Sequence, residues 1–269
     1  MIKELENFTS KYHGIFDSHA HYNDSAFDSD REELLSSLPS LGVENAVCVG
    51  YDLPSSQKAV EIAEQYPHIY AAACLHPENL EEYSEDGIDR LRPLLAHPKT
   101  VAIGEIGLDY HWKEMPPDLQ QRAFTRQLSL AREMGLPVII HAREATEDTL
   151  SILKDFTDVR GVVHCFSGSA ETAKILAGWG FYIGFTGILT FKNARHPVEA
   201  CAVVPKEQLL LETDCPYMAP VPWRGKRSCS PMIQSVAERM AEIKGVSAQE
   251  MIDIAAENTR RLFGIGGER

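Results

Sequence analysis

The chain has 269 residues, of which 44% are hydrophobic and 24% are charged. This composition is typical of a folded globular protein and excludes a disordered, collagen-like or disulfide-scaffold chain. Lys and Arg together number 26 against 39 Asp and Glu, so the net charge is −13. That balance excludes a broadly basic nucleic-acid-binding protein, and a phosphodiester substrate would need metal ions or a local basic loop to offset the negative field.

The sequence favours a cytoplasmic location. Residues 1–6 lack the apolar segment of a secretory signal. No apolar run approaches the roughly 18–20 residues of a membrane span, so no membrane association is expected. The cysteines contain no CxxC pair, which in a chain of this size favours reduced, mostly buried thiols. They are Cys48, Cys74, Cys165, Cys201, Cys215 and Cys229.

Short apolar runs recur along the chain, each followed by a longer amphipathic stretch. They are rich in Val, Ile, Leu and Ala and too short for helices, which is typical of strands buried on both faces. Eight such strands are predicted: Gly14–Asp17, Ala46–Val49, Ile69–Leu75, Val101–Glu105, Leu136–His141, Gly161–His164, Phe181–Phe185 and Gln208–Glu212.

The stretches between these runs carry helical spacing of apolar residues. The clearest faces lie at Leu34–Leu41, Phe124–Met134, Thr149–Phe156 and Ala173–Ala177, and the first two end at Gly42 and Gly135. The tail from about residue 231 to residue 263 predicts two helices that meet at 245–247. Ser247 is the expected N-cap of the second, with Glu250 completing a capping box.

The alternation of strands and helices predicts the fold class. Eight strand-then-helix units favour a parallel sheet, and eight is the number that closes a (β/α)8 TIM barrel. An open doubly wound sheet is the alternative, but it would need a Gly-rich loop after its first strand, where the chain has Asp17–His21. We therefore expect an α/β fold, a single TIM-barrel domain over residues 1–269 with additional C-terminal helices.

Metal-binding residue types lie at the carboxyl ends of the predicted strands, where barrel enzymes place their chemistry. They are His19, His21, Glu105, His141, His164 and Asp214. One tetrahedral ion needs only three protein ligands plus water, so six suit two ions about 3.5–4 Å apart with a bridging carboxylate. We expect His19, His21 and Asp214 around one ion, His141 and His164 around the other, and Glu105 shared.

Each of these residues taken alone has a simpler interpretation. A lone His-x-His is weak evidence, and a single His at a strand end is more often hydrogen-bonded in the core. An unpaired polar group in an apolar interior costs several kcal/mol, however, so six at one rim favour a cation. The histidines outside strand ends are expected to be mostly solvated; they are His13, His68, His97, His111 and His196.

Other residues near strand ends are candidates for substrate binding. His76 could donate to a substrate oxygen or cap its loop. Arg143 could bind a phosphate beside the metals or pair with Glu144 or Glu147. The only dense basic run contains Trp223, Arg224 and Arg227, which could stack on bases and contact phosphates or form a solvated loop.

Two further features have open interpretations. Ser167–Ser169 begins a predicted helix, so it could bind an anion or serve only as an N-cap. Asp17 and Glu212 could orient the metal ligands or be buried partners within the barrel.

Six segments in order resemble the TatD-like metal-dependent deoxyribonucleases, barrel members of the amidohydrolase superfamily. The segments are Asp17–His21, His76–Pro77, Gly104–Tyr110, Leu136–Arg143, His164–Gly168 and Leu211–Pro216. The resemblance covers nearly the whole chain. It implies the same six metal ligands and a magnesium-dependent 3′-to-5′ exonuclease activity on DNA.

The leading hypothesis is a metal-dependent phosphodiester hydrolase, a 3′–5′ exodeoxyribonuclease on single-stranded DNA or 3′ ends. Asp214 would be the general base and Glu105 the bridging ligand at a water activated by one or two divalent metals. Four imidazoles favour zinc, manganese or nickel, whereas the family resemblance implies magnesium. The alternatives are a binuclear hydrolase of a small amide, lactone or phosphoester and a noncatalytic metal-stabilised binding protein. No obligate protein partner is indicated.

Overall fold

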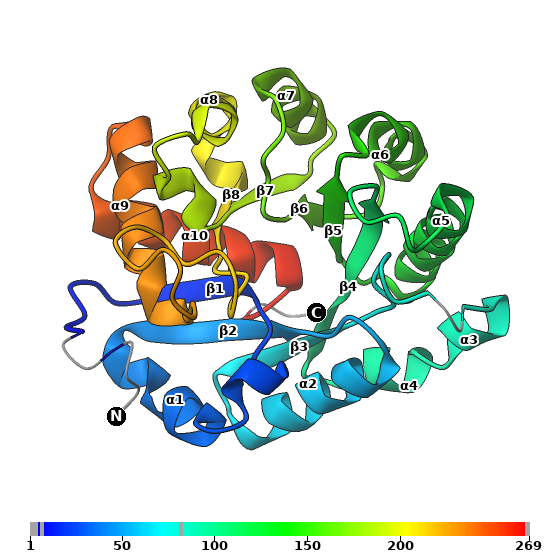
Figure 1. Cartoon of the computed structure of the whole chain (residues 1–269), viewed down its shortest axis with the longest axis horizontal. Helices are drawn as coiled ribbons and strands as arrows, with labels where there is room; N and C mark the ends of the chain where they lie inside the picture. Colours follow the sequence, from blue (N-terminus) through cyan, green and yellow to red (C-terminus); the bar gives the residue numbers. More distant parts are fainter. Residues whose placement is uncertain (1–4, 6–7, 81–82, 267–269) are drawn as a thin grey trace.

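The eight expected strands form one parallel sheet whose order around the fold follows the chain (Figure 1). The computed structural model describes residue 5 and residues 8–80 and 83–266. A parallel bridge between Ala20 and Cys215 joins the first strand to the segment after the last. The strands are β1 (Ile15–Ala20), β2 (Val43–Val49), β3 (Ile69–Ala73), β4 (Thr100–Asp109), β5 (Val138–Arg143), β6 (Gly161–Val163), β7 (Tyr182–Phe185) and β8 (Leu209–Leu211). The predicted (β/α)8 barrel is confirmed.

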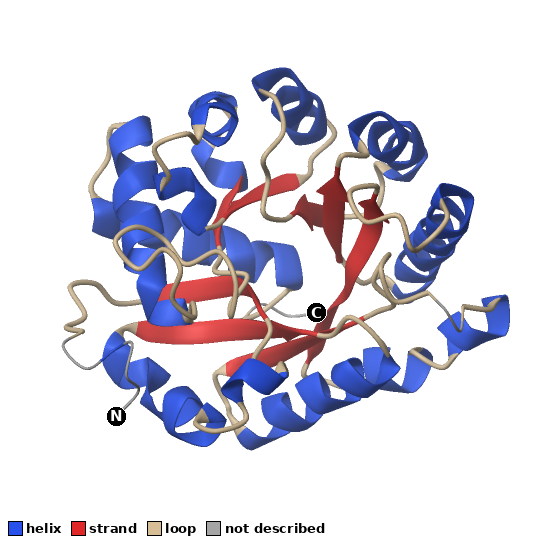
Figure 2. Cartoon of the chain, viewed as in Figure 1, coloured by secondary structure: helices blue, strands red, loops and turns tan. Residues whose placement is uncertain are grey.

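Helices surround the strands (Figure 2). They are α1 (Arg31–Ser37), α2 (Leu53–Gln65), α3 (Glu85–Asp89), α4 (Arg92–Leu95), α5 (Pro117–Met134), α6 (Thr146–Leu153), α7 (Ala170–Gly178), α8 (Arg195–Val203), α9 (Ile233–Lys244) and α10 (Ala248–Phe263). Short 3-10 helices lie at Ser25–Phe27, Leu38–Leu41, Lys154–Phe156, Gly187–Thr190, Lys206–Gln208 and Ser230–Met232. No described helix is both long and apolar enough to cross a membrane, and none of the six cysteines is in a disulfide.

The two predicted tail helices, α9 and α10, and the Ser247 N-cap are confirmed, but the reciprocal Glu250 contact of a capping box is not found among the described residues. The two helices meet at Gly245, which has a left-handed backbone, and the Ser247 side chain accepts the Glu250 N–H at 3.2 Å. The Leu34–Leu41 face is split, because the α-helix tightens to a 3-10 turn before Gly42. The Thr149–Phe156 face likewise ends in a 3-10 turn.

Helix α10 covers one end of the barrel. Its residues Leu262 and Phe263 pack with interior side chains such as Phe16 of β1 and Leu210 of β8 in one buried cluster. Asn258 of the same helix donates to the backbone oxygens of Lys206 and Leu209, at the start of β8. The amino-terminal end of the strands is therefore covered, so chemistry is confined to the carboxyl end.

Strand β4 is longer than the predicted Val101–Glu105 and carries Glu105 in its middle. Its pairing with β5 shifts register between Ile103 and Ile106, a local irregularity that surrounds Glu105. Gly107 has a φ of +145°, and a Cβ there would meet the His141 carbonyl oxygen at 2.0 Å. Only glycine permits this approach, which brings the two strands that carry Glu105 and His141 together.

Candidate metal centre

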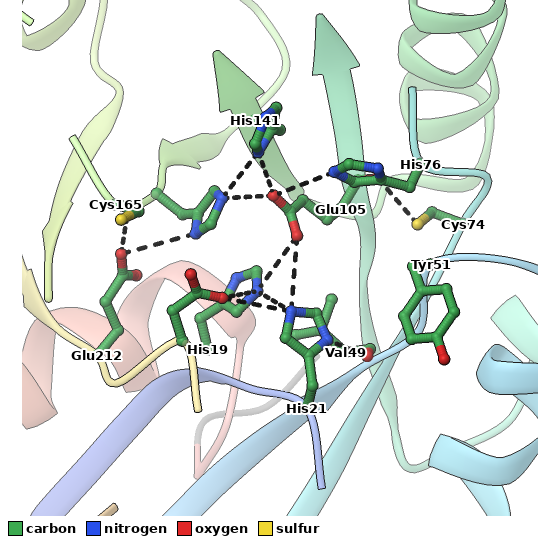
Figure 3. Close-up of polar contacts among 12 residues, drawn as sticks. His19, His21, Val49, Tyr51, Cys74, His76, Glu105, His141, Cys165 and Glu212 are labelled. Atoms are coloured by element: carbon green, nitrogen blue, oxygen red, sulfur yellow. Dashed lines mark hydrogen bonds and ion pairs between the residues drawn. The ribbon is translucent and has the colours of Figure 1, made fainter. Parts of the chain in front are cut away.

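The six predicted ligands converge at the carboxyl end of the barrel. Figure 3 labels four of them, His19, His21, Glu105 and His141. His19 and His141 lie in β1 and β5, and Glu105 lies in β4. His21, His164 and Asp214 follow β1, β6 and β8 within a few residues. All six are almost fully buried except His141 and Asp214, which are partly exposed. The barrel thus collects residues far apart in the sequence into one polar cluster.

Glu105 lies between two groups of ligands and presents one carboxylate oxygen to each. Its Oε2 is 3.4 Å from His19 Nε2 and 3.7 Å from His21 Nε2. Its Oε1 is 2.6 Å from His141 Nδ1 and 2.5 Å from His164 Nε2. A carboxylate in this position can bridge two cations.

Asp214 completes the first group. Its Oδ1 is 3.6 Å from His19 Nε2 and 3.4 Å from His21 Nε2. Two triads, His19–Glu105–His164 and His19–His21–Asp214, have ligand atoms within 4.8 Å of one another. Imidazole nitrogens with carboxylate oxygens form a donor set that fits divalent transition metals. The residues present can therefore hold metal ions.

Hydrogen bonds behind the ligands fix how two imidazoles point. His21 Nδ1 lies 2.9 Å from the Val49 carbonyl oxygen, and His141 Nε2 lies 2.8 Å from Asp109 Oδ2. Both acceptors require a ring N–H, so in the neutral form of each ring, the form that binds metal, the opposite nitrogen presents its lone pair to the cluster. Asp109 thereby becomes a positioning residue, a role that its place at the strand end did not reveal.

Metal uptake is expected to release protons. Burial opposes protonation of His21 and His141, yet the carboxylates of Asp214, Glu105 and Asp109 raise their pKa values to about 9 and about 10. Both imidazoles of the metal-free protein are therefore charged at pH 7, and each must lose a proton to bind an ion. Metal affinity should therefore rise with pH until about 10, where both imidazoles are neutral, and about two protons should be released on binding at pH 7. Calorimetric Mn²⁺ titrations in buffers of different ionisation enthalpy measure this number, and a buffer-independent heat would contradict it.

Two buried carboxylates support the site from behind. Asp17 accepts hydrogen bonds from the Thr213 N–H and hydroxyl at 3.0 and 2.6 Å, and so ties β1 to the segment that carries Asp214. Burial raises its pKa to about 6. Glu212 accepts from the Cys165 N–H, and its Oε1 is 3.8 Å from His164 Nδ1. Burial raises the Glu212 pKa to about 7.

A cavity of about 710 Å³ opens over the cluster. Its lining residues include five of the six ligand side chains together with His76, Arg143 and Ser167. His76 Nε2 is 3.6 Å from Glu105 Oε1, so this residue adjoins the centre. Ser169, by contrast, accepts the Thr172 N–H at 3.2 Å as the N-cap of α7.

Arg143 stands exposed at the edge of this cavity. Its guanidinium lies 5.7 Å from the Trp112 ring and makes no ion pair with a described residue, while Glu144 pairs with His111 at 2.6 Å. The alternative interpretation, an ion pair of Arg143 with Glu144 or Glu147, is therefore not found among the described residues. The guanidinium is available to a ligand.

The basic loop lies outside the cavity. The two terminal nitrogens of Arg227 donate to Asp30, at 2.7 and 2.5 Å, and Arg224 lies 4.4 Å from the Phe191 ring. The Trp223 ring packs 6.0 Å from Phe8. The structure does not bring these three predicted substrate contacts to the metal ligands, because their side chains hold the loop against its neighbours. Contact with a longer substrate stays a prediction.

Sequence reasoning missed several residues of the cavity wall, among them Tyr51, Glu78, Trp112 and Tyr217. All lie in loops beyond strand ends, where neither hydrophobic periodicity nor a ligand pattern singles them out. The histidines away from strand ends are exposed or half-buried, as expected. His68, for example, is half-buried and contacts the Leu35 carbonyl oxygen at 3.0 Å.

Comparison with known proteins identifies the family. The model of "TatD related DNase" matches residues 16–264. The chain belongs to the TatD-related DNase family. Among TatD-related proteins, it is 45% identical to "uncharacterized metal-dependent hydrolase YabD" of Bacillus subtilis, covering 93% of this chain and 99% of the relative. It is 32% identical to "3′-5′ ssDNA/RNA exonuclease TatD" of Escherichia fergusonii, with the same coverages. The solved structure of the TatD homologue YJJV from Escherichia coli matches with a TM-score of 0.88 and 31% identity, over 93% of this chain and 98% of that one. This TatD-related chain is a metal-dependent hydrolase.

Proposed function

We propose that the chain is a two-metal phosphodiesterase that removes nucleotides from the 3′ ends of single-stranded DNA. The observation that supports this most is Glu105, which presents one oxygen to His19 and His21 and the other to His141 and His164. A site for two cations stabilises both the attacking and the leaving oxygen of a phosphoryl displacement. The relatives named as 3′-5′ ssDNA/RNA exonucleases support the same substrate class.

The protein groups have distinct roles in this proposal. His19, His21 and Asp214 would hold one ion, His141 and His164 the other, and Glu105 both. When bound, the two ions would lower the pKa of water and neutralise charge on the phosphoryl group. They would also add four positive charges to a protein whose net charge is −13.

Asp214 is the proposed general base. Burial opposes its ionisation, but the His21 contact and the neighbouring imidazoles hold the Asp214 pKa below its ordinary value. The group is therefore ionised at neutral pH and can accept the proton that water loses. Arg143 at the rim can hold a second phosphate through its guanidinium fork.

The imidazole-rich ligand set favours manganese, zinc or nickel over magnesium by affinity, because magnesium prefers oxygen ligands. Metal analysis of protein purified without a chelator identifies the resident ion. Turnover with each ion in metal-depleted protein then shows which ones support the reaction.

A substrate panel tests the activity. We expect metal-loaded protein to release labelled mononucleotide from 3′-labelled single-stranded DNA at once, and to shorten 5′-labelled DNA stepwise. Single-stranded RNA, a small phosphotriester, a lactone and an amide complete the panel. Turnover of a small ester or amide without any cleavage of nucleic acid would replace the proposal with a small-molecule hydrolase. Binding of metal without turnover of any substrate would point to a noncatalytic role.

A further inference from the structure

Two exposed aromatic side chains mark the mouth of the cavity. Within the described part of the chain, Trp112 and Tyr217 are the only aromatic side chains among the exposed large hydrophobic residues, at 49% and 54%. Both line the cavity above the metal ligands. Leaving large apolar rings in water is unfavourable, and two exposed rings that line the same cavity suit a ligand that covers both.

Hydrogen bonds from the main-chain N–H groups fix the backbone of each aromatic residue relative to the ligands. The Trp112 N–H donates to Asp109 Oδ1 at 3.2 Å, and Asp109 Oδ2 binds His141. The Tyr217 N–H donates to the Asp214 carbonyl oxygen at 2.9 Å. Each aromatic residue is therefore attached to a residue that positions or forms one of the two ligand groups.

The two rings approach from opposite sides of the barrel. Trp112 follows β4 and Tyr217 follows β8, and these strands stand across from one another in a ring of eight. The Tyr51 ring, which follows β2, adds another aromatic surface 6.1 Å from the His21 ring (Figure 3). The ligands lie between, so a phosphodiester held there has one nucleoside directed toward each side.

Charge at the rim favours contact with bases over contact with the backbone. The cavity is lined by the carboxylates of Asp24 and Glu78 in addition to the acidic ligands, whereas Arg143 is the one Lys or Arg in its described lining. Away from the proposed metal ions, the phosphates of a substrate would lie against a negatively charged cavity wall. Aromatic rings accept every base, because all bases have a π-face, but only when the base is unpaired.

We propose that Trp112 and Tyr217 form a two-sided clamp that stacks on the two nucleobases flanking the scissile phosphate. This inference rests on the proposed nuclease function and deepens it, since it assigns the residues that select an unpaired strand. Arg143, which lies over the Trp112 ring, supports the Trp112 side through its cation–π contact.

The experiment compares a single-stranded hexathymidylate with two analogues that carry one abasic residue, either 3′ or 5′ of the terminal phosphodiester. On the normal strand, Trp112→Ala and Tyr217→Ala should each lower kcat/KM by about 5- to 150-fold. On each abasic strand, the variant whose ring would face the missing base should have the same kcat/KM as the wild-type protein. The other variant should show the same fold reduction in kcat/KM as on the normal strand. Trp112→Phe and Tyr217→Phe should recover most of the rate.

Control measurements isolate the contribution of the two rings. Ile175→Ala removes a residue of similar exposure, 43%, on helix α7 and should leave every rate unchanged. Fluorescence polarisation with the labelled hexamer, on an Asp214→Asn background, should show the same order of affinities. Equal losses on both abasic strands, or no loss on the normal strand, would overturn the clamp while wild-type cleavage upholds the nuclease. A wild-type protein that cleaves no oligonucleotide with any metal would instead overturn the proposed function.

Discussion

Glu105→Gln should reduce turnover at least about a hundredfold and lower the metal content from two ions to one or fewer. The glutamine keeps the size of the side chain but replaces one carboxylate oxygen with an amide NH2, which cannot bind a cation. In the structure the two oxygens face separate groups, so either orientation of the amide removes a ligand from one of them. Losing about 3 kcal/mol of charge stabilisation in a two-metal reaction corresponds to this rate.

Metal content per chain by mass spectrometry and kcat on single-stranded DNA check the Glu105 prediction together. Glu61→Gln is the matched control, because Glu61 is exposed on helix α2 outside the barrel. It should retain both ions and full activity. A Glu105→Gln protein that keeps two ions and wild-type turnover would show that this carboxylate does not bridge a functional site.

The sequence predicted the barrel and the ligand cluster for the same physical reason. In a parallel barrel the carboxyl ends of all strands meet at one rim. The position of a polar residue at such an end can therefore be predicted even when its partners are far along the chain. His19 and Asp214 are separated by nearly two hundred residues, yet each directly follows or ends an apolar run. Their contact at 3.6 Å follows from topology alone.

Loop residues were beyond this reasoning, because their neighbours depend on how each loop folds. Trp112 and Tyr217 lie only three residues from Asp109 and Asp214, but no periodicity indicates that they face the cavity. Arg227 illustrates the opposite error, because the sequence predicted a substrate contact that the structure does not place at the cavity. Its basic run is typical of substrate contact, whereas Asp30, distant in sequence, binds both of its terminal nitrogens. Strand length was also underestimated at β4, since a register shift lets the strand continue past Glu105 to Asp109.

Asp214→Asn should lower kcat by about 10²- to 10⁴-fold while the fold and most of the metal are retained. Asparagine keeps a carbonyl oxygen that can face His19 and His21 as Oδ1 now does, at 3.6 and 3.4 Å. It cannot accept a proton at neutral pH, so the contribution of a general base is lost. Melting temperature, metal content and kcat measured on the same preparation separate these effects.

If Asp214 acts only as a ligand, the outcome differs. In that case Asp214→Asn would lose metal and activity together, and excess metal would restore the rate. A general base predicts the opposite result, because saturating metal cannot replace a missing proton acceptor. Asp253→Asn, at an exposed position of α10, should behave as wild type. The position of Asp214, buried among imidazoles that keep it ionised yet open to the cavity, is what a base at this site requires.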